Sequence, residues 1–153
     1  MRHQAGGVAV VATGDEGARA GLTATAVASV SDAPPTLLVC VNQSASAHAT
    51  LVNVGTFSVN FLSRSQDRIA DAFSGRTDHV GEHRFSIGAW TTLATGAPIL
   101  TGAIASLDCR LDQRHESGTH SIFIGTVIET AHSADAAPLV YFRSRYWSVG
   151  EGA

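Results

Sequence analysis

The sequence is poor in charged residues, in cysteine and in long apolar runs. Only 15% of its 153 residues are charged and the net charge is −3, so the chain lacks the basic surface that nucleic-acid binding requires. It has no run of about 18 apolar residues that could span a bilayer. Residues 1–7 are too polar and too short for a secretory signal. These absences predict a cytoplasmic protein that binds neither nucleic acid nor membrane.

The two cysteines, Cys40 and Cys109, both lie within apolar, strand-like runs. Burial as free thiols is the expected state, and nothing calls for an oxidising compartment. Hydrophobic residues make up 44% of the chain, which is typical of a folded domain. The length predicts one domain over residues 1–153. The low charge also suggests that a second subunit covers part of the surface.

Common catalytic and nucleotide-binding motifs are absent as well. Gly14, Gly17 and Gly21 do not match the dinucleotide fingerprint, and they precede a predicted strand where the fingerprint requires a helix. The sequence contains neither a phosphate-binding Gly-x-x-x-x-Gly-Lys loop nor a Gly-x-Ser-x-Gly nucleophile elbow. His79 and His83 are four residues apart but lie in a loop-like stretch, so we expect solvated histidines and no metal site.

What the sequence does contain is strand-like alternation over most of its length. Strands are expected over 8–13, 23–31, 36–41, 57–62, 104–111, 120–130 and 139–146. The strand 36–41 is continuously apolar, which predicts burial on both faces. Many strands with few helices indicate a closed or nearly closed antiparallel barrel, because closure removes exposed sheet edges.

Two short helices interrupt this pattern. One is expected over 47–54 with Ser46 as its N-cap, and an amphipathic one over 65–73 with Ser65 as its cap. Residues 75–88 are expected to form a long polar loop that carries Arg76.

The segment 23–31 carries the clearest functional signal. Successive side chains of a strand point to opposite faces, so one face of this segment is small and apolar. The apolar face consists of Ala24, Ala26, Ala28 and Val30, and the other carries the hydroxyls of Thr23, Thr25, Ser29 and Ser31. Such a strand lets a flat polar ligand lie close to the backbone. An ordinary amphipathic strand with a solvated Ser/Thr face gives the same alternation.

His120 is the most interesting histidine, because it opens a predicted strand directly after the turn residues Gly118 and Thr119. A histidine at a strand mouth can hydrogen-bond the phosphate, ribose or carboxamide of a ligand. The alternative is a half-buried histidine at a strand end, with its ring satisfied by the backbone.

Taken in order, six segments resemble the flavin reductase family. They are 21–31, 34–42, 57–62, 96–100, 118–127 and 138–146. The resemblance extends from Gly6 to Trp147 and depends on the order and spacing of the segments. It implies a mainly β fold, the antiparallel FMN-binding split β-barrel, Greek-key-like and with two or three short helices. It also implies a homodimer that binds flavin in a groove near the subunit interface.

The resemblance further implies which residues contact the cofactors. The residues expected to bind them are Thr23, Ala24, Thr25, Ala26, Ser29, Val30, Ser31, Asn42, Gln43, Ser44, Ser46, Arg76, His120 and Tyr146. Residues 23–26 would run along the isoalloxazine ring, 29–31 would continue that wall, and 42–46 would reach the ribityl and phosphate portion. Arg76 is a phosphate or adenosine contact. His120 matches the histidine of the family's Gly-Asp-His signature, beside nicotinamide and flavin, and is the expected catalytic residue.

Two features depart from the family pattern. Thr119 stands where the signature has Asp, so a hydroxyl replaces the carboxylate. The N-terminal helix common in the family is expected to be cut short before Gly6.

The function that follows from the resemblance is NAD(P)H-dependent flavin reduction. Hydride passes from NADH or NADPH to FMN or FAD, and reduced flavin passes to a partner monooxygenase. Because the cofactors carry the chemistry, the protein needs to position them and requires no nucleophile. The alternative is a non-enzymatic flavin- or haem-binding carrier or sensor, which the Thr119 departure keeps open. A split-barrel oxidase of a pyridoxal-type phosphate is a weaker alternative, because the ligand strand carries no basic residue.

Overall fold

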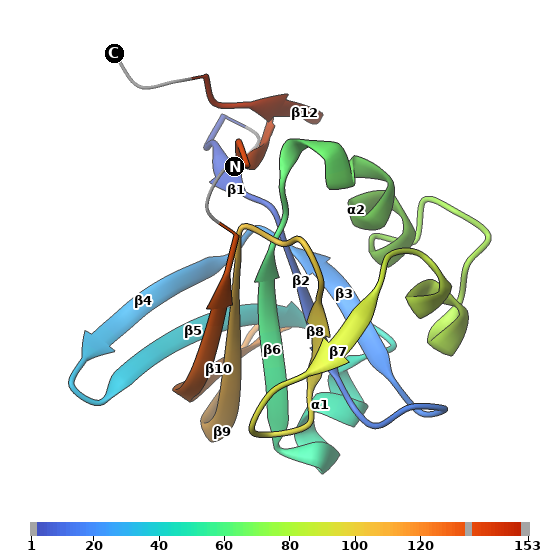
Figure 1. Ribbon diagram of the computed structural model, residues 1–153. Coiled ribbons are helices and arrows are strands. Elements are labelled where there is room, and N and C mark those ends of the chain that lie inside the picture. The colour runs from blue at the N-terminus through green and yellow to red at the C-terminus, as the bar shows by residue number, and fades with distance from the viewer. Residues whose placement is uncertain (1–2, 134–135, 151–153) are drawn as a thin grey trace.

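The structure is a computed structural model that describes residues 3–133 and 136–150 (Figure 1). In chain order its elements are β1 (Gly6–Gly7), β2 (Ala9–Thr13), β3 (Ala20–Ala24), β4 (Val27–Asp32), β5 (Pro35–Asn42), α1 (His48–Val54), β6 (Thr56–Phe61), the 3₁₀ helix η1 (Arg64–Gln66), α2 (Asp67–Phe73), the 3₁₀ helix η2 (Gly81–Ser86), β7 (Trp90–Thr92), β8 (Pro98–Leu100), β9 (Ala105–Ser117), β10 (His120–His132), β11 (Leu139–Phe142) and β12 (Arg145–Ser148). Within the described ranges, no helix is long and apolar enough to cross a membrane.

Seven strands form the main sheet, in the spatial order β3-β2-β6-β9-β10-β5-β4, and each of these neighbours pairs antiparallel. The two edge strands, β3 and β4, are consecutive in the chain and only Thr25 and Ala26 separate them. The sheet therefore curls until its edges approach each other, and the amide of Cys40 on β5 donates to the carbonyl of Ala26 at 3.0 Å. This is the predicted split barrel.

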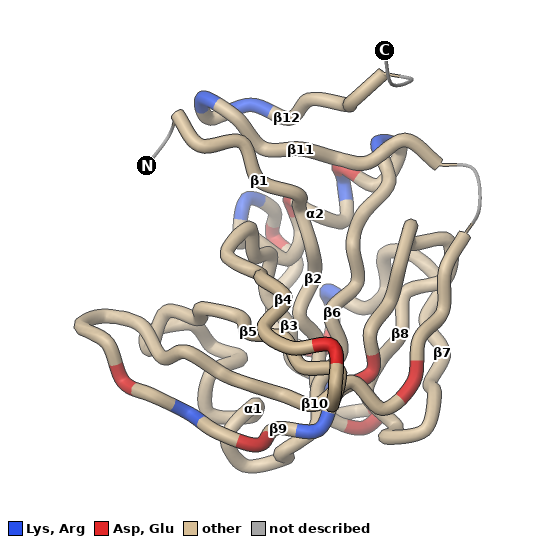
Figure 2. The backbone as a smooth tube through the Cα atoms, turned by 90° about the vertical axis from the view of Figure 1, so that its left-hand side faces the viewer, with Lys and Arg blue, Asp and Glu red and all other residues tan. Residues whose placement is uncertain are grey.

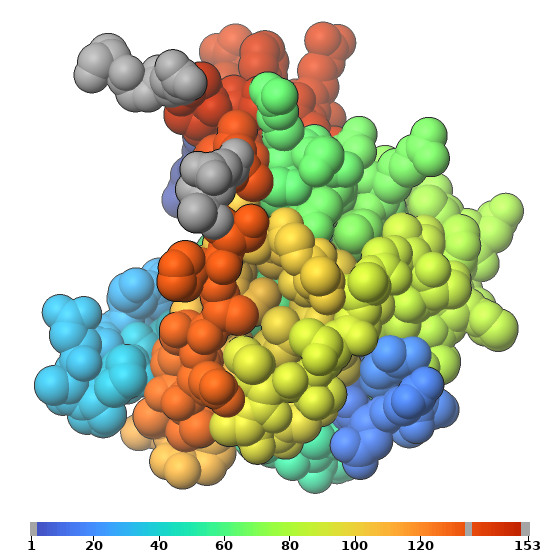
Figure 3. Space-filling view, in the orientation of Figure 1, coloured from blue at the N-terminus to red at the C-terminus, as the bar shows by residue number. Residues whose placement is uncertain are grey.

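Two apolar cores fill the molecule, one inside the curled sheet and one between the sheet and α2. The strand β2 serves both, because Ala9 and Val11 face the barrel interior while Val10 and Ala12 face α2. All five β2 residues are buried. The C-terminal hairpin and α2 cap one end of the molecule, and the β4–β5 hairpin projects as a separate lobe (Figures 1 and 3).

Gly21 on β3 is where α2 packs most closely against the sheet. A Cβ at this position would lie 2.8 Å from the Phe73 ring and 2.9 Å from the carbonyl oxygen of Val11. We expect Gly21→Ala to lower the free energy of unfolding by about 1–3 kcal/mol, because a backbone atom cannot yield as a side chain can. Urea unfolding measures the loss. Gly7→Ala is the matched control, since a Cβ there meets no described atom within 4 Å, and an equal loss in both variants would contradict the packing argument.

The predicted strand 23–31 is two strands. β3 pairs with β2 and β4 pairs with β5, and the chain changes partner at Thr25 and Ala26. The predicted hairpin of 8–13 with the start of this segment is confirmed. The alternation predicted strand structure correctly on either side of the break, but it gave no sign of the change of partner. In β4 a register irregularity between Ser29 and Ser31 interrupts the alternation, and Ala28 and Val30 are both exposed.

The prediction that 36–41 is buried on both faces is wrong. Leu37, Val39 and Val41 point into the core, whereas Leu38 and Cys40 are half-exposed on the outer face of the sheet. Cys40 is therefore a half-exposed thiol. Cys109 is buried as predicted, and burial, with a smaller contribution from Asp108, raises its pKa to about 12.

Several local features also differ from expectation. The N-cap of α1 is Ala47, without a side-chain cap, and the capping box before α2 uses Ser63 and Gln66 at the start of η1. The segment 75–88 contains η2, because Phe85 is buried there against Phe73 and Trp90. The predicted strand 139–146 is the hairpin β11–β12, whose turn residues 143 and 144 have φ of 50° and 62°.

Candidate functional site

The bend at 25–26 lies between two surfaces that carry the candidate site residues. Thr23 and Thr25 line a cavity on one side, together with residues of α2 and of the C-terminal hairpin. Ala26 is exposed, and its carbonyl accepts a hydrogen bond from the amide of Cys40 on β5.

The cavity has a volume of about 230 Å³. It is lined by Val8, Thr23, Thr25, Ser74, Arg76, Tyr141 and Tyr146. The hydroxyl of Thr23 donates to the carbonyl of Ala70 on α2 at 2.7 Å, which ties β3 to the helix. The sheet, α2 and the β11–β12 hairpin thus each supply one wall.

Arg76 is held in place at this cavity by three side chains. Its Nη1 donates to Asp71 Oδ1 at 3.2 Å and its Nη2 to the Tyr141 hydroxyl at 3.0 Å, and the guanidinium lies 5.6 Å from the centre of the Tyr146 ring. The hydrogen bond to Tyr141 raises the pKa of Arg76 above its ordinary value, although burial opposes the shift. A fixed, planar cation of this kind suits a phosphate group, because guanidinium donors match phosphate oxygens in geometry.

Tyr146 completes the cluster by donating its hydroxyl to Asp71 Oδ1 at 2.9 Å. Burial, together with this hydrogen bond to a carboxylate, raises the pKa of Tyr146 from 10.0 to about 12. We expect an alkaline spectrophotometric titration to show one of the two tyrosines of the chain ionising only near pH 12.

Tyr146→Phe should remove the ionisation step near pH 12, and Asp71→Asn should move that step to lower pH. Because the pKa is raised in the folded state, the phenol stabilises the fold fully below pH 10, and this contribution disappears as the pH rises toward 12. A late step that survives in Tyr146→Phe would contradict the assignment.

The outer face of β5 and β10 is the second surface. The register pairs Cys40 with Ile122 and Leu38 with Ile124, so these half-exposed apolar side chains share one face. The same register places Asn42 opposite His120 at the end of the face, where both are exposed. The apolar outer face of β5 and β10 therefore ends at two polar side chains, one from each strand.

The segment after β5 is folded by its own polar groups. Asn42 Oδ1 accepts hydrogen bonds from the amide of Ser44 at 2.9 Å and from its hydroxyl at 2.8 Å. Ser46 follows and is exposed before α1. The predicted phosphate segment is thus a tight turn beside His120.

His120 itself is exposed on the first residue of β10. Its Nδ1 lies 2.9 Å from the hydroxyl of Thr119, the residue that replaces the family's carboxylate. A hydroxyl can donate to or accept from the imidazole, so the pair orients the ring in either tautomer and adds no charge to it.

The structure brings the predicted residues together in two groups and leaves others apart. Thr23, Thr25, Arg76 and Tyr146 share the cavity, and Asn42, Gln43, Ser44 and His120 meet at the end of the outer face. Ala24 is buried in the barrel core. Ser29, Val30 and Ser31 are exposed on the edge strand β4, and the Ser31 hydroxyl accepts from the amide of Ala33 in the β4–β5 turn.

Sequence reasoning missed Tyr141 and Asp71. Asp71 lies on α2 and reads as an ordinary solvent-facing carboxylate. Tyr141 faces Arg76 only because the C-terminal segment folds back as a hairpin, and no local pattern in the sequence reported that turn.

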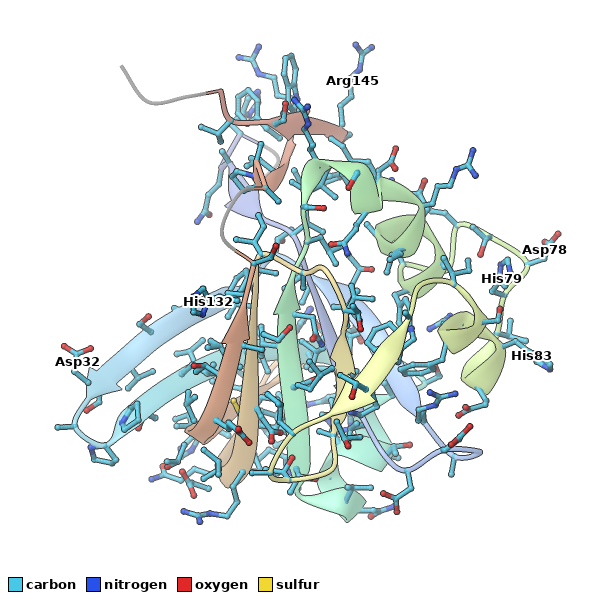
Figure 4. All side chains as sticks on the ribbon, viewed as in Figure 1. Asp32, Asp78, His79, His83, His132 and Arg145 are labelled. Carbon is cyan, nitrogen blue, oxygen red and sulfur yellow. The ribbon has the colours of Figure 1, made fainter. Side chains whose placement is uncertain are left out.

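His79 and His83 lie on the segment between α2 and β7, well away from the β4–β5 lobe (Figure 4). The Nδ1 atom of His79 is 3.1 Å from the hydroxyl of Thr77. Within residues 3–133 and 136–150, no group of three or more His, Cys, Asp or Glu side chains is arranged to hold a metal ion. The C-terminal hairpin and α2 carry arginines, and the second half of β9 carries both basic and acidic residues (Figure 2).

Comparison with known proteins agrees with this architecture. The family model described as flavin reductase like domain matches residues 1–150. The chain is 45% identical over 146 residues to the FMN reductase (NADH) RutF of Methylorubrum populi, covering 95% of this chain and 71% of that protein. It is 45% identical over 150 residues to the RutF of Ancylobacter novellus, covering 97% and 81%.

Solved structures are similar along nearly the whole chain. The NADH:FAD oxidoreductase of Streptomyces globisporus is 31% identical with a TM-score of 0.88, covering 97% of this chain and 89% of that one. The flavin reductase component of a bacterial two-component tryptophan halogenase is 32% identical with a TM-score of 0.90, covering 99% and 94%. The fold, the grouping of the site residues and these matches lead to one conclusion: the chain belongs to the flavin reductase family.

Proposed function

We propose that the protein is an NADH:flavin oxidoreductase that reduces FMN or FAD. The observation that supports this most directly is the pairing of Asn42 with His120 at the end of the outer sheet face. It places an amide and an imidazole side by side at one end of the half-exposed apolar face of β5 and β10. The relatives named FMN reductase (NADH) and NADH:FAD oxidoreductase support the choice of NADH as donor.

The residues present fit a flavin. Ala26 is exposed and has only a Cβ beyond the backbone, so a ring can approach the bend closely. Asn42, Ser44 and Ser46 supply amide and hydroxyl groups for the ribityl chain, and Arg76 supplies a fixed cation for a phosphate or adenosine phosphate group. When both cofactors are bound, the nicotinamide donates a hydride and the flavin ring accepts it.

The chain contributes orientation to this reaction. The sheet fixes the rim residues and the bend relative to one another, which removes the entropic cost of aligning two rings. His120 would hold the nicotinamide through its imidazole, and the Thr119 hydroxyl would orient that imidazole ring. None of these tasks requires a nucleophile, which agrees with a site built from small, amide and hydroxyl side chains.

Two further parts of the proposal concern partners. The half-exposed apolar side chains Leu38, Cys40, Ile122 and Ile124 support a homodimer, because a second copy would remove them from water. A relative that serves a two-component halogenase supports transfer of the reduced flavin to a partner oxygenase. The free thiols fit a reducing compartment, and we assign the reaction to the cytoplasm.

The test is NADH oxidation by the purified protein, followed as loss of NADH absorbance with FMN, FAD or riboflavin added. We expect turnover that requires both NADH and a flavin, and slower turnover with NADPH. Flavin binding without NADH oxidation would instead make the protein a carrier. Light scattering coupled to gel filtration measures whether the chain is a dimer.

A further inference from the structure

The turn that carries His120 is tied to the segment 42–46 through one exposed carboxylate. Glu116, near the end of β9, accepts a hydrogen bond from the Ser121 hydroxyl at 2.7 Å and another from the side-chain amide of Gln43. Arg114 on the same strand pairs with it at 3.0 Å. Glu116 therefore joins β9, β10 and the end of β5.

Gln43 makes the second set of links. Its backbone amide donates to the carbonyl of Thr119 at 3.0 Å, and its side-chain Nε2 donates to the carbonyl of His120 at 3.2 Å as well as to Glu116. Both hydrogens of that Nε2 are thus used within the protein. This differs from the role that the family resemblance implies for Gln43, which is contact with the ligand.

Ser121 connects Glu116 to the buried side of the sheet. Its side chain is fully buried, and because its hydroxyl donates to Glu116 it accepts from Nε2 of His48 on α1, at 2.8 Å. The His48 ring packs edge-on against the buried Phe123, with 5.4 Å between ring centres. The start of β10 is therefore fixed to α1 as well as to β9.

His120 depends on these links for its position. Its own side chain contacts the hydroxyl of Thr119, which lies in the two-residue turn after β9, where Gly118 has a φ of 58°. The bonds from Gln43 to the carbonyls of residues 119 and 120, and the acceptor that Glu116 supplies, hold that turn against the end of β5.

We propose that Gln43 and Glu116 are positioning residues, which hold His120 and the 42–46 segment as one unit so that flavin and NADH are bound in a fixed mutual geometry. This inference rests on the proposed function for its catalytic consequence. It assigns Gln43 to the support of the site, because its side-chain amide hydrogens are used within the protein.

The experiment compares Gln43→Ala and Glu116→Ala with Asp112→Ala as matched control. Asp112 lies on the same strand as Glu116. It likewise accepts a hydrogen bond from a hydroxyl on β10, that of Thr126, but it lies away from the turn. We expect each positioning variant to raise both the Kd for FMN and the KM for NADH and to lower kcat about tenfold, because small misplacements of bound groups are costly. Asp112→Ala should change none of these values more than about twofold.

Two further readouts separate positioning from general damage. Amide hydrogen exchange should accelerate at residues 43 and 119–121 in both positioning variants, with the barrel strands β2 and β6 unchanged. The double variant should lose little more than either single one, because both remove the same unit. Full additivity, or unchanged exchange at these amides, would overturn the inference.

The outcomes also distinguish this inference from the proposed function. If the wild-type protein fails to oxidise NADH with any flavin, the proposed function is wrong, whereas the exchange data still decide whether Gln43 and Glu116 hold the turn. If the wild type is active and the variants match Asp112→Ala in kcat, KM and FMN binding, the positioning role is wrong.

Discussion

Ala26→Leu is expected to weaken flavin binding about 10- to 100-fold in a protein that remains folded. Ala26 is exposed at the bend between β3 and β4, and its contribution to the fold is the carbonyl that accepts the amide of Cys40. A leucine keeps that carbonyl and adds three carbon atoms to the surface on which the ring would lie. Overpacking of a close-fitting site costs about 1–3 kcal/mol, so a loss of affinity of about 10- to 100-fold follows.

Titration of flavin fluorescence measures the affinity, and thermal unfolding verifies the fold. Ala89→Leu is the matched control, since Ala89 is also exposed and its carbonyl likewise accepts a backbone amide, that of Thr101. It should bind flavin as the wild type does. Unchanged flavin affinity in Ala26→Leu would show that the ring does not lie against the bend.

The bend illustrates what the sequence could and could not predict. Alternation of small and hydroxylated residues identified β3 and β4 correctly as strand, because the period of two reports local backbone geometry. The change of partner at Thr25 and Ala26 depends on which strands lie across the sheet, from β2 on one side to β5 on the other. That information is non-local, and single-sequence periodicity does not contain it.

The same limit applies to burial. Leu38 and Cys40 read as core residues because the five apolar residues 37–41 offer no polar face to mark the outside. In the structure Leu38 and Cys40 lie opposite Ile124 and Ile122 of β10 on the outer face, and they remain half-exposed. An apolar run therefore predicted the strand well and its environment poorly, and the exposed face is what the dimer proposal explains.

The family resemblance pointed to candidate site residues at the ends of two neighbouring strands, whereas the side-chain partners of these residues could not be predicted from the sequence. Asn42 and His120 were expected near the cofactors from the family resemblance, and the register places them side by side. Gln43 was expected to face the ligand with them, yet its amide hydrogens are taken by Glu116 and His120. The direction of the Gln43 side chain therefore depends on hydrogen-bond partners more than seventy residues away in the chain.

His120→Ala is expected to raise the KM for NADH about tenfold while changing the Kd for FMN less than twofold. The imidazole is exposed at the rim of the outer face, and loss of one hydrogen bond to a bound ligand costs about 1 kcal/mol or somewhat more. The side chain of Gln43 holds the 42–46 segment through the carbonyl of residue 120 and not through its ring, so the flavin contacts should survive.

His132→Ala is the matched control for this change, because His132 is exposed at the opposite end of the same strand (Figure 4). Steady-state kinetics at saturating FMN give the KM for NADH, and equilibrium titration gives the Kd for FMN. Thr119→Ala should raise the KM for NADH in the same direction but by less, since it releases Nδ1 without removing the ring. A larger loss of FMN affinity than of NADH affinity in His120→Ala would place the histidine on the flavin side of the site. Its role toward the nicotinamide would then be wrong, and Asn42 would be the remaining rim residue able to orient the hydride donor.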